Sequence, residues 1–336
     1  MNRLKFYHLV SVIFFALAIS GCDHETDTFD GPNLVDRFGD FTILDSLVVS
    51  QATVDFAAGE TVFFAARFNK TVNWVVEITG TESGAVKRIE GFDSELVAGN
   101  ATWTGGTTDL PFFKAEMCTV QLLVPEEAGF LDSGEVNVVS AKIYEGSLFA
   151  DFEEDAGTDI FFGNFEFELT NQTGRQDNMP AAQGDYYYLF EGTDDVVSNF
   201  FVGLININST ITGQTYAPLP TTVPEELYFN CFLYADGGPF GIAVIQFAFD
   251  TNGNGVFDDG TDATFQVEGD FPLNWEGWQH ISHPMSDVGM TQAQLEKIVA
   301  IRVLLISDKN SQPDPPLPVD FGIDFITFTA GEPLAL

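Results

Sequence analysis

The stretch "LYFNCFLYAD", residues 227 to 236, alternates between two kinds of side chain. Successive side chains of a β-strand point to opposite faces, so this period of two is typical of a strand with one face in a core. One face would be uniformly apolar, and the other mixes rings with an amide. The apolar set is Leu227, Phe229, Cys231 and Leu233, and the mixed set is Tyr228, Asn230, Phe232 and Tyr234.

The same period recurs along most of the chain. The segments "TVFFAARF" (61–68) and "VNWVVEITG" (72–80) each place apolar residues on one face, and Gly, Asp and Asn breakers separate such runs. Helical periodicity is confined to residues 290–299, where Thr291 is a candidate cap ahead of Gln294. The sequence therefore predicts an all-β chain.

The strands fall into two groups. Residues 35–146 contain about seven short strands with Trp74 on an early one, which is the size and rhythm of an immunoglobulin-like sandwich. No cysteine pair flanks Trp74, and the segment resembles the Ig or PKD-like modules of bacterial surface proteins. Residues 147–336 restart with "LFADFEEDAGTDI" and contain eight or more strands, for which we expect a larger jelly-roll sandwich.

The amino-terminal residues predict where the protein is located. Residues 1–21 have a short basic start and an apolar run that is shorter than the roughly 20 residues of a membrane span, which is the layout of a signal peptide. The pattern "AISGC" that ends at Cys22 resembles the lipobox of bacterial lipoproteins. This resemblance implies cleavage before Cys22 and acylation of Cys22. The acidic residues Asp23, Glu25 and Asp27 resemble the export tag of glycan-degrading Gram-negative lineages, which implies an anchor in the outer membrane facing the cell surface. The alternative is retention at the inner membrane, which an aspartate directly after the cysteine signals in some bacteria. Residues 22–34 are predicted to form an acidic tether. The alternative to the lipobox is an ordinary signal peptide in which Cys22 is incidental.

The charge balance excludes some partners. Removing Arg3 and Lys5 from the 13 basic residues leaves 11 against 50 acidic residues, a net charge of −39 for the mature chain. Such a charge opposes nucleic acid, whose phosphates attract basic surfaces, and it suits divalent cations. The chain is 45% hydrophobic with 34 Phe, so it is not a disordered acidic chain. Cys118 and Cys231 sit in apolar strand patterns of different groups, so we expect buried thiols and no disulfide.

Three segments of the second group resemble a known family. They are "DFE" (151–153), "LNWEGWQHISHPM" (273–285) and "VDFGIDFITFT" (319–329), and they look like parts of the galactose-binding-like β-sandwich of carbohydrate-binding modules. The whole layout resembles the surface glycan-binding lipoproteins of starch-utilisation-type systems. The resemblance implies a non-catalytic protein that captures polysaccharide beside an outer-membrane glycan importer. The alternative function is a structural or adhesive lipoprotein that contacts another protein.

The resemblance also implies a structural calcium ion, shared by a glutamate at the start of the sandwich and an aspartate on its last strand. The matching residues are Glu153 (or Glu154) and Asp324. A buried, unpaired carboxylate is costly, so Asp324 needs a partner. Arg302, in "IVAIRVLLIS", is the competing candidate.

A second candidate calcium site lies in "DTNGNGVFDDGTD" (250–262). Asp250, Asn252 and Asn254 alternate and Gly255 stands sixth, as at the start of an EF-hand loop, with Asp258 at the ninth position. The twelfth position is a threonine, so Asp259 or Asp262 would have to replace the missing carboxylate. The alternative is a plain hairpin loop between two strands.

Candidate sugar contacts come from rings that can stack on apolar C–H faces and from amides that bind hydroxyls. The candidates are Trp275, Trp278, Tyr187, Tyr228, Asn230, Tyr234 and Gln246, where Gln246 would join the mixed face of 227–236. The alternative for each ring is an ordinary place in the core or at its rim. His280 and His283 would point to opposite faces of one strand, and no nucleophile, phosphate-loop or zinc motif occurs. Both groups of strands resemble small sandwiches that usually bind, so we do not expect an enzyme. The alternative is a glycoside hydrolase, which needs only two carboxylates at the right separation, and the chain has 50 acidic residues.

Overall fold

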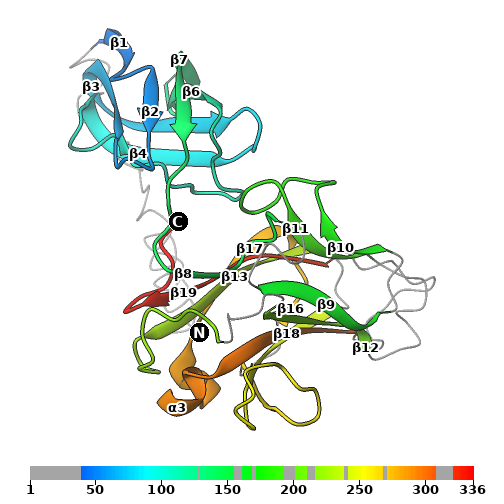
Figure 1. Cartoon of the computed structure of the whole chain (residues 1–336). Coiled ribbons are helices and arrows are strands. Elements are labelled where there is room, and N and C mark those ends of the chain that lie inside the picture. Colours follow the sequence, from blue (N-terminus) through cyan, green and yellow to red (C-terminus); the bar gives the residue numbers. More distant parts are fainter. Residues whose placement is uncertain are drawn as a thin grey trace, which may run out of the picture.

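The computed structural model contains two β-units, which lie one above the other in Figure 1. It describes residues 39–127, 129–154, 161–168, 172–191, 201–209, 216–237, 241–267, 271–307 and 321–336. The signal peptide, Cys22 and the acidic tether lie outside the described residues. Strands dominate both units, so the prediction of an all-β chain is confirmed.

The N-terminal unit is a sheet that folds over on itself around one long strand. Its strands are β1 (Ile43–Val49), β2 (Thr53–Asp55), β3 (Val62–Gly80), β4 (Val86–Leu96), β5 (Thr102–Trp103), β6 (Met117–Val124) and β7 (Gly129–Ser140). The order is β1-β3-β6-β7-β2, and β4 and β5 also pair with β3. The first half of β3 pairs with β1 and β5, and its second half with β6, so one strand serves both layers.

The core of this unit follows the alternation read from the sequence. Residues at every second position of β3 are buried, and Trp74 is only 1% exposed, as predicted. The Trp74 indole leaves no room for a side chain at position 91 of the neighbouring strand β4, because a Cβ at Gly91 would lie 2.2 Å from the Cζ2 atom of the indole. Only glycine therefore fits at that position across the strand pair.

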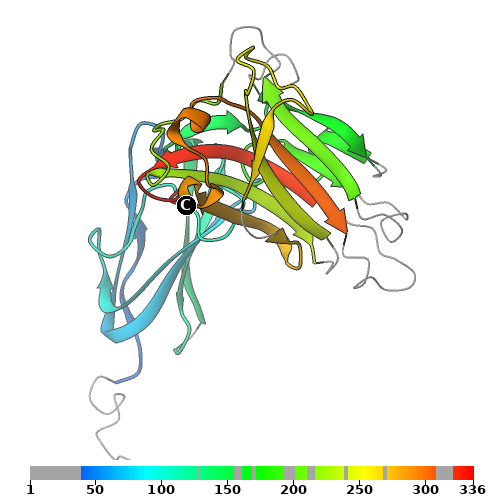
Figure 2. The ribbon, with the colours of Figure 1, turned by 90° about the horizontal axis from the view of Figure 1, so that it is seen from below.

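The C-terminal unit is a sandwich of two antiparallel sheets. The proximal sheet, next to the N-terminal unit, has the order β10 (Gln172–Gln176), β11 (Tyr187–Glu191), β19 (Phe321–Ala330), β13 (Leu227–Asp236) and β17 (Glu276–Pro284), with β8 (Ser147–Ala150) on β19. The distal sheet has the order β15 (Ala263–Gln266), β14 (Gly241–Phe249), β18 (Ile298–Ser307), β12 (Phe201–Ser209) and β9 (Phe161–Glu168), with β16 (Phe271–Pro272) on β14. Figure 2 shows these strands from below.

The apolar face predicted for residues 227–236 lies between the two sheets. Leu227, Phe229, Cys231 and Leu233 are fully buried there, against Ile245 and Phe247 of β14 and others. Cys118 and Cys231 are both buried free thiols, as expected.

The predicted helix 290–299 is too long. A 3₁₀ turn (Met285–Val288) and one helical turn, α3 (Gln292–Leu295), are present, and the expected capping box between Thr291 and Gln294 closes the turn. The helix ends there because β18 begins at Ile298. None of the helices in the described part of the chain is long and apolar enough to cross a membrane.

An aromatic cluster joins the two units. Phe112 of the N-terminal unit stacks on Tyr144 of the connecting segment (ring centroids 4.0 Å apart), and it meets Phe232 and Phe325 of the proximal sheet edge-on. The backbone N–H of Phe112 also donates to the carbonyl of Ala182. Phe112 is 2% exposed and Phe232 is fully buried, so this contact removes part of the outer face of the proximal sheet from solvent.

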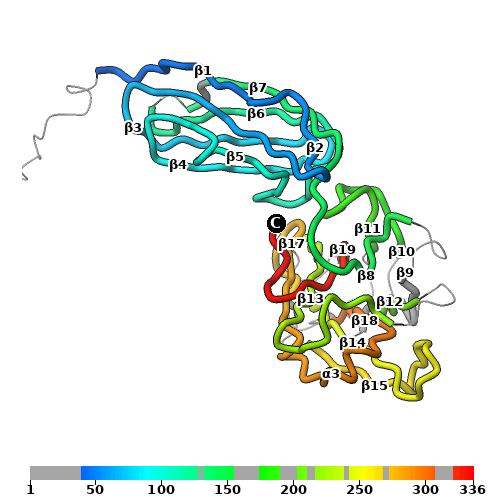
Figure 3. Tube along the Cα trace, turned by 60° about the vertical axis from the view of Figure 1, so that its left-hand side comes forward, coloured from blue at the N-terminus to red at the C-terminus, as the bar shows by residue number. Residues whose placement is uncertain are grey.

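The C-terminal residues cover more of the same face. Asn230, which is fully buried, accepts a hydrogen bond from the N–H of Leu334 through Oδ1 and donates to Thr329 through Nδ2. Leu334 and Leu336 pack into the aromatic cluster, and Lys142 donates to the carbonyl of Ala335. The C-terminal end therefore lies between the two units, as Figures 1 and 3 show.

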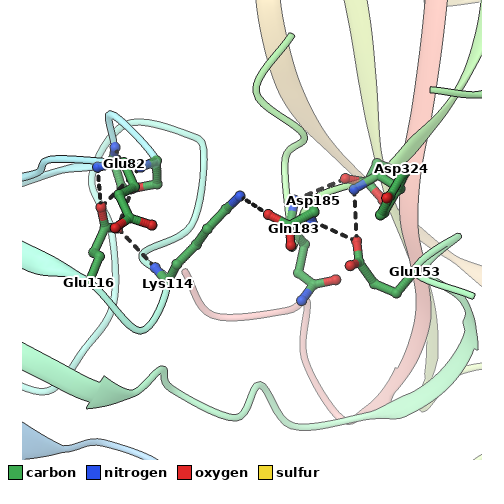
Figure 4. A network of polar contacts seen from close by, with 10 residues as sticks. Glu82, Lys114, Glu116, Glu153, Gln183, Asp185 and Asp324 are labelled. Atoms are coloured by element: carbon green, nitrogen blue, oxygen red, sulfur yellow. Dashed lines mark hydrogen bonds and ion pairs between the residues drawn. The ribbon is translucent and has the colours of Figure 1, made fainter. Parts of the chain in front are cut away.

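A polar network runs beside the cluster (Figure 4). Glu116, 3% exposed, accepts hydrogen bonds from the N–H groups of Glu82, Ser83 and Lys114 and from the Ser83 hydroxyl. Lys114 reaches across the junction to Asp185 (Nζ–Oδ1 2.5 Å). Burial alone would raise the pKa of Glu116, but these hydrogen bonds outweigh it and hold the pKa below its usual value.

We expect Glu116→Gln to lower the free energy of unfolding by about 1–3 kcal/mol, because an amide cannot accept on both sides. A lowered carboxyl pKa contributes stability above its unfolded value, near 4.5, that is lost as the pH falls through the folded value. The variant should therefore lose less stability than the wild type on acidification below that value. Urea denaturation between pH 7 and pH 3 measures both effects, and the control is Glu135→Gln, a substitution of an exposed glutamate on β7. Equal acid sensitivity of wild type and variant would contradict this role.

Candidate functional site

The candidate rings lie mostly on the proximal sheet, where the contact between the two units covers part of the face that carries them. Tyr187 is fully buried with its hydroxyl bonded to Asn178, and Asn230 is buried under the C-terminal residues. Neither side chain offers surface to a sugar. Tyr228 is half-buried at the same end of β13. The mixed face of residues 227–236 does exist, but its central part is a junction between units and not an open groove.

The accessible remainder of this face lies around Gly322. A Cβ there would lie 3.1–3.3 Å from Trp278, Tyr234 and Tyr187, so three rings surround a glycine. Trp278 and Tyr234 are half-buried, and the Trp278 indole N–H donates to the carbonyl of Pro180. Trp275 is also half-buried, packs against the sandwich core and donates to the carbonyl of Gly277. The indole N–H groups of both tryptophans are therefore used within the protein: Trp278 binds segment 178–182, and Trp275 binds the start of β17.

The expectation that Gln246 joins the mixed face of residues 227–236 is wrong. After β13 the chain crosses to the other layer, so β14 and Gln246 belong to the distal sheet. Ala243, Ile245 and Phe247 of β14 point into the core, and Gln246 therefore points to the outer face of that sheet.

On this outer face, strand register brings four polar residues into one row. Gln246 pairs with Gln266 of β15 on one side and with Arg302 of β18 on the other, and Arg302 pairs with Asn206 of β12. Neighbouring strands are about 4.8 Å apart, so the row Gln266–Gln246–Arg302–Asn206 spans about 14 Å. We call these four residues the distal row. It crosses the strands at a right angle to the chain direction.

Aliphatic residues border the distal row. The next row toward β16 consists of Val244, Leu304 and Leu204, which are paired across β14, β18 and β12. These residues are buried or half-buried. The outer face of the distal sheet thus combines hydrogen-bonding groups with an apolar strip, which is the chemical combination that sugars require.

Arg302 is the central and best-held residue of the distal row. Its Nε donates to Asn206 Oδ1 at 2.8 Å, and its guanidinium lies 3.5 Å from Asp259 Oδ1 and 5.5 Å from the Phe257 ring centroid. The side chain is 13% exposed. Arg302 is therefore not the partner of Asp324, which is a correction: the two residues lie in different sheets. Asp259, a candidate calcium ligand, lies against the guanidinium and not with Asp250 and Asp262, the carboxylates that accept hydrogen bonds from the backbone of loop 250–262.

The loop 250–262 lies at one end of the distal sheet, after β14, and is the yellow segment in Figure 2. Asp250 accepts hydrogen bonds from the N–H groups of Gly253 and Gly255 and from the Tyr216 hydroxyl. Asp262 accepts from the N–H groups of Thr251 and Asp258. These two carboxylates, 1% and 9% exposed, hold the loop in a fixed shape. The loop connects β14 to its antiparallel neighbour β15 as a hairpin.

The candidate calcium ligands of this loop do converge, but through hydrogen bonds. The amide nitrogens of Asn252 and Asn254 both donate to Asp258 Oδ2. The amide oxygens accept from the N–H groups of Asn254 and Val256. The side chains that would surround a cation thus satisfy one another. Phe257 and Asp259 project from the same loop onto Arg302, so the loop shape fixes one end of the distal row.

The second candidate calcium pair, Glu153 and Asp324, lies beside the turn 183–186 (Figure 4). Glu153 Oε1 accepts from the N–H groups of Asp185 and Tyr186, and Asp324 accepts from those of Gln183 and Phe325. Neither carboxylate has a cationic partner within the described residues. Burial, together with the neighbouring carboxylates of Glu153 and Asp151, raises the pKa of Asp324 well above its usual value despite the two hydrogen bonds.

Other chemistry is sparse. Among the described residues, no group of three or more His, Cys, Asp and Glu side chains is arranged to hold a metal ion. His280 contacts Asn230 and stacks on Phe232, and burial lowers the pKa of its imidazole. It is therefore a packing residue of the junction.

Asn206 is not among the site residues predicted from the sequence, and Arg302 is predicted only as a candidate partner of Asp324, although a signal for their shared row is present. Gln246 and Arg302 are each a lone polar residue in the middle of an apolar strand, and Asn206 interrupts the run "LINI" in the same way. Such residues on three strands point to one row, but only the strand order shows that the strands are neighbours.

No protein-family model matches the chain, and no curated protein sequence matches it. Solved structures with similar folds include the CBM22-1 xylan-binding domain of Xyn10C from Paenibacillus barcinonensis (11% identity, 57% of this chain and 99% of that chain covered, TM-score 0.33). A family 30 carbohydrate-binding module (13%, 55% and 99%, TM-score 0.36) is also similar. So is the family 11 module from Clostridium thermocellum, solved with a β-1,3-1,4-mixed-linked tetrasaccharide (14%, 57% and 98%, TM-score 0.32).

Proposed function

We propose that this protein is a non-catalytic glycan-binding lipoprotein that captures neutral polysaccharide on the outer face of its distal sheet. The observation that carries the proposal is the distal row, where register aligns two amides, a guanidinium and a further amide across four strands. The row lies beside an apolar strip, and a loop with a ring and a carboxylate fixes its central arginine.

The chemistry suits a sugar chain that crosses the strands. Amides both donate and accept, and a guanidinium presents several donors in a fixed fork, so together they match the alternating donors and acceptors of ring hydroxyls. The half-buried Leu304 would meet an apolar C–H face, with Val244 and Leu204 buried on either side of it, and the half-buried Phe257 ring beside Arg302 supplies a stacking surface at one end. The half-buried rings of Tyr234 and Trp278 on the proximal sheet are the alternative stacking site.

A neutral ligand is favoured by the charges. The chain carries a formal net charge of −37, and Arg302 is already opposed by Asp259. An anionic polysaccharide would meet long-range repulsion with little local compensation.

Replacing Arg302 with Met keeps the apolar stem and removes the guanidinium, so we expect glycan affinity to fall roughly 10- to 100-fold. Gln246→Ala, which removes neutral hydrogen bonds, should weaken it about 3- to 10-fold. Affinity gel electrophoresis of the mature chain with mixed-linkage β-glucan, xyloglucan, galactomannan and starch measures the effect.

Two substitutions of the same types away from the distal row are the controls: Arg67→Met on β3 and Gln279→Ala on β17. Both variants should bind glycan as the wild type does. Loss on Tyr234→Ala with Arg302→Met unaffected would move the site to the proximal sheet. Absence of retardation by all four polysaccharides, with capture of an outer-membrane protein by the same chain, would contradict glycan binding and support an adhesive lipoprotein.

The place of action is proposed from the sequence. Acylated Cys22 would anchor the protein in the outer membrane, where an importer could receive the captured glycan, and several acyl chains hold a protein firmly. Cys22→Ser should move the protein from the membrane fraction to the soluble fraction of fractionated cells. Equal membrane retention of wild type and variant would contradict a lipid anchor.

Calcium is proposed at Glu153 and Asp324. The donor set fits, because two carboxylates lie beside one turn without a cationic partner among the described residues, and Ca²⁺ prefers such oxygen ligands. The ion would neutralise the fully buried Asp324 and hold the turn 183–186, which carries Asp185 to the junction.

Added calcium should therefore raise the melting temperature of chelator-treated protein, and Asp324→Asn should abolish that rise. Differential scanning calorimetry with EDTA and then with excess CaCl₂ measures it, and the exposed Asp287→Asn is the control. A calcium response that persists in Asp324→Asn would contradict this assignment and implicate loop 250–262.

A further inference from the structure

A cleft of about 540 Å³ opens between the two units, away from the distal row. Phe112 from the N-terminal unit, Tyr144 from the connecting segment, and Phe325 and Leu148 from the proximal sheet line it. Its size is within the range of small-molecule sites, and apolar and aromatic side chains dominate such sites. Because both units contribute walls, the cleft exists only where the aromatic cluster holds them together.

Two polar groups of this lining lack partners. The Tyr144 hydroxyl and Gln183 Oε1 are both buried, and neither has a hydrogen-bond partner within the described part of the chain. Leaving such a group unsatisfied costs about 1–3 kcal/mol, so native structures seldom tolerate two of them in the lining of one cleft without a reason. Burial raises the pKa of the Tyr144 hydroxyl, so it stays protonated and can donate. A ligand hydroxyl can accept from Tyr144 and donate to Gln183.

The charged groups of the cleft are already engaged. Lys114 pairs with Asp185 (2.5 Å), and Lys142 donates to the carbonyl of Ala335 and lies 4.6 Å from the Tyr144 ring centroid. Burial and the nearby Lys87 lower the pKa of Lys142. Lys114 is therefore neutralised by a carboxylate, and Lys142 is the one lining cation among the described residues without an ion pair. In a chain with a net charge of −37, this single lysine gives an anion little net attraction.

We propose that this junction cleft binds a single neutral, hydroxyl-bearing ring, in chemical terms one sugar unit. The apolar walls contact its C–H faces, and Tyr144 and Gln183 pair with its hydroxyls. The site shares no residue with the distal row, so it stands or falls independently of the proposed function.

Saturation-transfer difference NMR with D-glucose, D-galactose, D-mannose and D-xylose tests the proposal. The mature chain carrying Arg302→Met serves as the parent, so that the distal row does not contribute. We expect transfer from at least one of the four sugars. Leu148→Trp, which fills the cleft from its exposed rim, should abolish the transfer, and Leu44→Trp on exposed β1 should leave it unchanged.

Tyr144→Phe separates a ligand contact from a structural role. It keeps the ring that stacks on Phe112 and removes only the unpartnered hydroxyl, so the melting temperature should not fall. The affinity for the sugar should fall about 3- to 10-fold, the effect of one neutral hydrogen bond. The proposal is overturned if no sugar of the four binds the parent, if transfer survives Leu148→Trp, or if D-glucuronate binds at least as tightly as D-glucose.

Discussion

The contact between Phe112 and the aromatic face of the proximal sheet constrains everything else in this protein. It buries Phe232, brings Tyr144 and Phe325 together, and leaves room for the C-terminal residues to bind Asn230. A β-sandwich has two outer faces, and this contact uses much of one of them. The other, on the distal sheet, is the face on which a long ligand would not meet the N-terminal unit.

The distal face is organised by register and by one loop. Lone polar residues of β14, β18 and β12 become a row only because each strand pairs without a slip at that point. The loop 250–262 then fixes Arg302 through Phe257 and Asp259, so a ligand at the proposed site would depend on the order of this loop. Preorganised donors lose less conformational entropy on binding, which would favour capture of a flexible glycan at the proposed site.

The sequence predicts the strands, the buried face of residues 227–236 and the core position of Trp74, because period-two patterning follows from strand geometry. It does not predict which layer a strand joins. From the sequence alone, Gln246 is therefore expected on the wrong sheet, and Arg302 is a candidate partner for Asp324 although the two residues lie in different layers. Nor does a mixed face reveal its occupant: the rings and the amide of Asn230 suit a sugar and suit the second unit equally well.

The central claim, that the distal face binds the glycan while the proximal face joins the units, can be tested in one set of NMR spectra. The Arg302 Nε–H and the Gln246 side-chain amide report on the distal face, and the Trp278 indole N–H, bonded to Pro180, reports on the proximal face. On titration with a soluble oligosaccharide of a retarding polysaccharide, the Arg302 and Gln246 signals should shift and the Trp278 signal should stay. Movement of Trp278 with Arg302 and Gln246 unchanged would contradict the account.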